Sequence, residues 1–81
     1  MPVTGHHVDW RDIEGSSKFE YFAANLDERT NEGFEKLVQE MEKDGWILVI
    51  ELRGFTMIHT REDRIASALR HGIVPFKRLK K

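Results

Sequence analysis

The chain has 81 residues, 40% of them hydrophobic, and its formal net charge is −1. This length is enough for one small domain with one modest core and too short for two. The absence of cysteine excludes disulfides and thiolate metal sites, and no apolar run approaches the roughly 20 residues of a membrane-spanning helix. The first residues lack the basic-then-apolar layout of a secretion signal, so we expect an intracellular protein, cytoplasmic or nuclear.

Charge is distributed unevenly along the chain. Residues 1–52 carry five Lys or Arg and twelve Asp or Glu, whereas residues 53–81 carry eight and two. Such an asymmetry can mark a surface for an anionic partner, and it can equally be a solvated surface that happens to be polarised.

The first two segments of the chain contrast in composition. Residues 1–17 are mainly polar, which predicts a mobile or loosely packed arm before a single domain over residues 18–81. His6 and His7 are adjacent and would point in different directions, so they do not form a metal site by themselves. Residues 18–26 are rich in aromatic side chains and predict the first strand.

The two predicted helices each carry an apolar stripe between recognisable caps. The first spans residues 31–44 and ends at Gly45, a residue suited to a left-handed cap. The second spans residues 61–71, begins with the capping-box spacing Thr60-Arg-Glu-Asp63 and ends at Gly72. The apolar positions of the first helix are Phe34, Leu37, Val38 and Met41.

Three further strands are expected around these helices. Residues 46–52 and 55–60 form two apolar runs around Arg53-Gly54, the pattern of a β-hairpin. Residues 73–79 form a last strand, which Pro75 confines to an edge or a bulge. The resulting order β-α-β-β-α-β is the ferredoxin-like arrangement. We therefore predict an α+β fold in which two helices cover one face of a four-stranded antiparallel sheet and the other face is open.

Part of this pattern resembles an RNA recognition motif, the RRM domain. The segment Tyr21-Phe-Ala-Ala-Asn-Leu26 is similar to the hexamer of that family's first strand, and Arg53-Gly-Phe-Thr-Met-Ile58 is similar to the octamer of its third strand. Met57 stands where the octamer has its second displayed aromatic residue, and Thr60 stands where it has an aromatic core residue.

The resemblance implies binding of single-stranded RNA on the open sheet face, where aromatic side chains stack on unpaired bases. Phe22 and Phe55 would be adjacent stacking platforms, and Met57 would add an apolar contact. The basic residues would bind phosphates. The expected nucleic-acid-binding residues are Phe22, Arg53, Phe55, Met57, His59, Lys77, Arg78, Lys80 and Lys81.

A second resemblance is to small bacterial and phage domains of unknown function, which carry a Gly-Trp pair after a helix and end in a short basic strand. The segments Lys43-Asp-Gly-Trp-Ile-Leu-Val49 and Phe76-Lys-Arg78 carry it, and it implies a homo-oligomeric binding module. The alternative to RNA binding is thus a protein-interaction or homo-oligomerisation module that uses Phe22, Phe55 and Met57 as a hydrophobic patch. We expect no enzyme and no cofactor, because neither the carboxylates nor the four histidines have a catalytic spacing.

Overall fold

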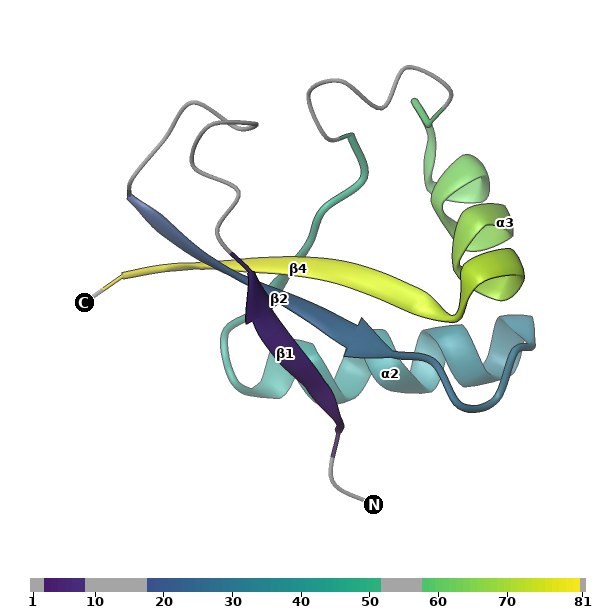
Figure 1. Ribbon diagram of the computed structural model, residues 1–81, viewed down its shortest axis with the longest axis horizontal. Coiled ribbons are helices and arrows are strands. Elements are labelled where there is room, and N and C mark those ends of the chain that lie inside the picture. Colours follow the sequence, from purple (N-terminus) through teal and green to yellow (C-terminus); the bar gives the residue numbers. More distant parts are fainter. Residues whose placement is uncertain (1–2, 9–17, 52–57, 81) are drawn as a thin grey trace.

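The computed structural model describes residues 3–8, 18–51 and 58–80. These residues form, in chain order, β1 (Gly5–Val8), β2 (Phe19–Asn25), α2 (Asn31–Lys43), β3 (Ile47–Leu48), α3 (Arg61–His71) and β4 (Ile73–Leu79). The strands make one antiparallel sheet in the order β1-β2-β4-β3, and α2 lies behind it in the view of Figure 1.

The fold class predicted from the sequence is confirmed. The chain is α+β, with a four-stranded antiparallel sheet and two helices, and it is consistent with a ferredoxin-like fold. The strands differ in detail from the prediction, because the predicted strand 46–52 is reduced to Ile47–Leu48. The predicted strand 55–60 lies partly outside the described residues, and its last residues, 58–60, are not in a strand.

The edge strand β1 occupies part of the predicted N-terminal arm. It pairs with β2, and the backbone N–H of Asn25 extends the ladder by donating to the Thr4 carbonyl at 2.8 Å. Gly5 permits this approach, because a Cβ at that position would overlap the carbonyl oxygen of Ala23. Four residues of the predicted arm are therefore part of the sheet, while residues 9–17 lie outside the described residues.

Both helices have the ends that their sequences predict. Helix α2 ends in a Schellman motif, in which Gly45 has φ +86° and the N–H of Trp46 donates to the Met41 carbonyl at 3.1 Å. Helix α3 begins with a complete capping box between Thr60 and Asp63. These caps fix where each helix stops and where the next strand starts.

The main core lies between the helices and one face of the sheet. Phe34 from α2 and both Val74 and Phe76 from β4 are its largest fully buried side chains, and Ala68 from α3 joins the same cluster. We call the opposite face of the sheet the outer face. It is not open as predicted, because several of its side chains are buried in the middle of the sheet. These are Tyr21, Ala23, Val49 and Pro75.

Candidate functional site

Phe22 lies on the helix side of the sheet rather than on the outer face. Its cross-strand partner is Phe76, and it packs against the main core. The Phe22 ring centroid is 5.7 Å from that of Trp46 and 5.2 Å from that of His7. The stacking platform expected at Phe22 therefore faces the helices. Strand β2 carries apolar side chains on both faces, so alternation alone could not fix its phase.

The basic residues of the predicted site lie in separate places. Lys77 is on the outer face, with its Nζ 4.8 Å from the centroid of the Phe19 ring. Arg78 follows it on the helix side, and Lys80 is exposed beyond the end of β4. His59 is exposed beside the start of α3. Four other predicted residues, Arg53, Phe55, Met57 and Lys81, lie outside the described residues.

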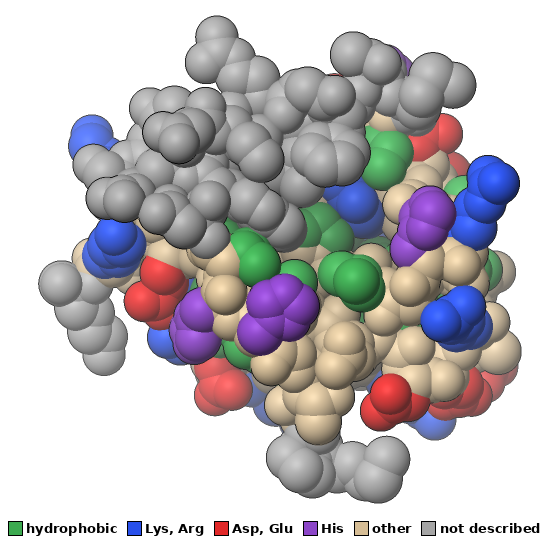
Figure 2. Space-filling view, viewed as in Figure 1, with side chains coloured by type: hydrophobic (Ala, Val, Ile, Leu, Met, Phe, Trp, Pro, Cys, Tyr) green, Lys and Arg blue, Asp and Glu red, His purple; other side chains and the backbone are tan. Residues whose placement is uncertain are grey.

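Large hydrophobic side chains are exposed on one face only within the described part of the chain. They are Ile47, Ile73 and Leu79, with exposed fractions of 51%, 43% and 61%. The strand register places all three on the outer face, with Ile47 opposite Lys77 and Leu79 opposite Phe19. We call Phe19, Ile47, Lys77 and Leu79 the outer patch. Figure 2, viewed as in Figure 1, shows hydrophobic side chains beside histidine and basic side chains near the middle of the molecule.

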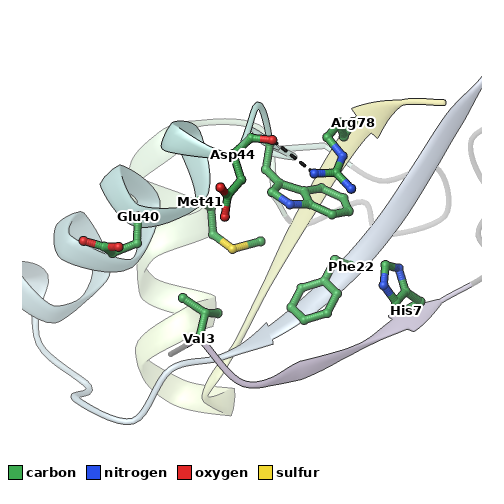
Figure 3. Close-up of a pocket in the computed structure, with 8 residues that line it drawn as sticks. Val3, His7, Phe22, Glu40, Met41, Asp44 and Arg78 are labelled. Carbon is green, nitrogen blue, oxygen red and sulfur yellow. Dashed lines mark hydrogen bonds between the residues drawn. The ribbon is translucent and has the colours of Figure 1, made fainter. Parts of the chain in front are cut away.

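A pocket of about 440 Å³ lies at the edge of the sheet, between β1 and the last turns of α2 (Figure 3). We call it the edge pocket. Its apolar lining consists of Val3, Phe22, Met41 and Trp46, and its polar lining consists of His7, Glu40, Asp44 and Arg78. Met41 and Asp44 border the space from the end of the helix, His7 and Phe22 border it from the neighbouring strands, and the Glu40 carboxylate points away from them. This volume falls within the range of small-ligand sites.

Arg78 is held in a fixed position at the rim of the edge pocket. Its Nε and Nη2 donate to Glu20 Oε1 at 2.7 and 2.5 Å, and its Nη1 donates to the Asp44 carbonyl at 3.1 Å. The guanidinium carbon is 4.2 Å from the centroid of the Trp46 ring. Charge-assisted hydrogen bonds and a ring contact together leave this side chain little freedom, and Glu20 balances its charge.

Two carboxylates near α3 have pKa values below their usual range. The Glu35 carboxylate accepts hydrogen bonds from Arg61, which lowers the pKa of Glu35 and raises that of Arg61. The Asp63 carboxylate accepts from the backbone N–H groups of His59 and Thr60, and these bonds lower its pKa. Both sets of hydrogen bonds stabilise the first turn of α3.

Arg64 is the buried charged residue of the described chain. It is 5% exposed, and its Nη2 donates to the Ile50 carbonyl at 2.6 Å while its Nε has no hydrogen-bond partner. Burial lowers the pKa of its guanidinium. No acidic side chain pairs with Arg64 among the residues described, so this side chain fixes the chain at Ile50 without forming an ion pair.

Sequence reasoning did not find the edge pocket or the outer patch. Glu40 and Asp44 look like ordinary surface residues of an amphipathic helix, and exposure at Ile47 or Leu79 cannot be read from residue type. A partial signal was present, because Trp46 and Arg78 belong to the two segments that carry the second resemblance, and their side chains meet here.

Neither a metal site nor a membrane span is found in residues 3–8, 18–51 and 58–80. These residues contain no group of three His, Cys, Asp or Glu side chains that could hold a metal ion. None of their helices is long and apolar enough to cross a bilayer. Comparison with known proteins found no matching family model, no matching curated protein and no matching solved structure.

Proposed function

We propose that the chain is a protein-interaction module that docks its partner on the outer patch. The observation that carries this proposal is the exposure of Ile47 and Leu79 on the outer face, where both lie next to Lys77 in the strand register. Single exposed apolar residues are common on monomers, but a set gathered on one face is typical of an interaction surface. The partner would bury Ile47 and Leu79, which are each more than half exposed.

The outer patch suits a protein better than it suits single-stranded RNA. Lys77 already lies over the Phe19 ring, so a base that stacked there would have to displace it. Arg78 lies on the other face and is paired with Glu20, so the two adjacent cations do not form one row for phosphates. RNA binding therefore stays a prediction with less support than protein binding.

A second copy of the chain is the partner to test first. A domain of this size has a small core, and burying exposed apolar side chains between two copies would stabilise it. Sedimentation equilibrium from micromolar to millimolar concentration should show an apparent mass that rises with concentration. In the variant Leu79→Glu the mass should stay that of a monomer, because a carboxylate would have to be buried among apolar groups.

Gln39→Glu is the matched control, because it adds the same charge at an exposed position of α2. It should associate as the unaltered chain does. If the unaltered chain is monomeric at every concentration, the partner is a different protein. The immobilised Leu79→Glu variant should then fail to capture proteins that the immobilised unaltered chain captures. Retention of the same proteins by both would overturn the proposal. Salt-sensitive shifts of outer-patch amides on adding oligonucleotides would assign the surface to nucleic acid instead.

A further inference from the structure

The edge pocket exists because the sheet extends beyond the helix that covers it. Strand β1 pairs with β2 alone at the end of the sheet order, and α2 packs over the core formed by the inner strands. The space between β1 and α2 is bounded by the aromatic rings of Phe22 and His7 on the strand side. This pocket is separate from the outer patch, because Phe22 and Lys77 point to opposite faces of the sheet.

The walls of the edge pocket suit an organic cation. Aromatic rings attract ammonium and guanidinium groups through their negative faces, and the chain already places its own Arg78 on the Trp46 ring. The Phe22 ring carries no such partner, because the cations that lie over rings in the described chain are Arg61, Lys77 and Arg78, and they lie over other rings. Phe22 is half-buried and contacts the Trp46 and His7 rings, so the part of its ring that lines the pocket is what a ligand could contact.

The charges around the edge pocket also favour a cation. Glu20 balances Arg78, which leaves Glu40 and Asp44 as the other acidic residues in the described lining of the pocket. Lys43 contacts Glu40 at 3.1 Å, but both side chains are more than half exposed, so water weakens this pair. The carboxylate of Asp44 has no cationic partner among the described residues.

The backbone of α2 adds to this negative potential. Asp44 is the C-cap of the helix, and the last carbonyl groups of a helix carry the negative end of its dipole, which attracts cations. Rings, carboxylates and a helix C-terminus therefore converge on one space of about 440 Å³. From this convergence we propose that the edge pocket binds an organic cation, namely a lysine or arginine side chain or a quaternary ammonium group.

The test is a titration followed by NMR, with the unaltered chain and blocked amino acids as probes. Blocked lysine, its trimethylated form and blocked arginine should give saturable shifts at the amides of His7, Phe22 and Trp46. Blocked norleucine, which is similar in size to lysine but neutral, should not. Tetramethylammonium separates the two sources of such a cation. If it binds as well as trimethyllysine, the head group alone is recognised and a free small molecule fits. If it binds more weakly, the alkyl stem contributes and a protein side chain fits.

Two variants test separately the contribution of the carboxylates and that of the Phe22 ring. The double variant Glu40→Gln and Asp44→Asn should weaken binding of the trimethylated probe about tenfold, and Phe22→Leu should weaken it by a similar factor of about ten, because each removes one attraction of moderate strength. Glu42→Gln is the control, because this residue is exposed on the same helix and does not line the pocket. Its affinity should equal that of the unaltered chain.

The proposal is overturned if norleucine binds as well as lysine, if no cation gives saturable shifts, or if the double variant binds with unchanged affinity. Leu79→Glu should keep its affinity for the cation, because it alters the outer patch only. A failure of cation binding therefore leaves the outer-patch proposal standing, and the reverse also holds.

Discussion

At Gly33 a close backbone contact outweighs the general preference of helices for alanine over glycine. It lies in the first turn of α2, where its N–H donates to Thr30 Oγ1 at 3.0 Å. A Cβ at this position would overlap the carbonyl oxygen of Glu28, which belongs to the backbone and cannot turn aside. Glycine normally costs a helix interior about 0.5–1 kcal/mol relative to alanine, so helix propensity alone favours an alanine here.

We expect Gly33→Ala to lower the free energy of unfolding by about 1–3 kcal/mol, because overpacking against the backbone outweighs the gain in helix propensity. Urea denaturation measures the change. Gln39→Ala is the matched control, since it places alanine at an exposed position of the same helix, and its effect should stay within about 0.5 kcal/mol. A Gly33→Ala protein as stable as the control would contradict the clash.

Residue types predict the caps well and the faces of the strands poorly. The capping box of Thr60 and Asp63 and the left-handed Gly45 follow from spacing alone, because these interactions join neighbours in the chain. The orientation of Phe22 does not, because apolar side chains occupy both faces of β2. A shift of one residue exchanges the two faces, and this shift moves Phe22 from the predicted RNA platform to the wall of the edge pocket.

Among the elements, the helices are predictable almost to the residue and the strands only in part. Helices were expected over residues 31–44 and 61–71, and they span Asn31–Lys43 and Arg61–His71. The residues that predict each helix, its apolar stripe and its caps, are close neighbours in the sequence. Strand β1 has the sequence Gly-His-His-Val, without apolar alternation, and is held by pairing with β2. Residues that line the edge pocket come from β1, β2, α2 and β4. Predicting the pocket from the sequence would therefore require predicting strand β1 first.

The dependence of β1 on its pairing gives a prediction for Gly5→Ala. The added Cβ would overlap the Ala23 carbonyl oxygen, which lies in the partner strand. We expect the strand to separate at this end, so the amide of Asn25, which donates to the Thr4 carbonyl at 2.8 Å, should exchange with solvent at least about tenfold faster. Hydrogen exchange followed by NMR measures this rate.

His6→Ala is the control for the edge strand, because His6 is exposed and its side chain can be shortened without a clash. The amide of Asn25 should keep its protection there. Amides in the buried part of β4, such as that of Phe76, should keep theirs in both variants, since they belong to the core. An unchanged Asn25 rate in Gly5→Ala would show that β1 tolerates the larger residue.

At the scale of the whole molecule, ion pairs between the acidic and the basic part of the chain offset some of the charge asymmetry. Within the described residues, ion pairs of Glu20 with Arg78 and of Glu35 with Arg61 join the acidic residues 1–52 to the basic residues 53–81. These pairs reduce the positive charge that residues 53–81 offer to an anionic partner. The asymmetry seen in the sequence therefore supports association between the two parts of the chain at least as well as binding of nucleic acid.

This internal pairing predicts how the whole domain responds to acid. The pKa values of Glu35 and Asp63 are lowered by hydrogen bonds from Arg61 and from the backbone at His59 and Thr60. The unfolded chain, with ordinary carboxyl pKa values of about 4, then binds more protons than the folded chain. The stabilisation is complete above that ordinary value and is lost as pH falls through the lowered folded values.

We therefore expect the free energy of unfolding to be nearly constant from neutral pH to about pH 5 and to decline below about pH 4. Urea denaturation across this range should show a shallower decline in the double variant Glu35→Gln and Asp63→Asn, because neither replacement titrates there. Glu32→Gln, an exposed position of the same helix, should keep the slope of the unaltered chain. Equal slopes in the double variant and the control would show that these two carboxylates do not cause the loss of stability at low pH.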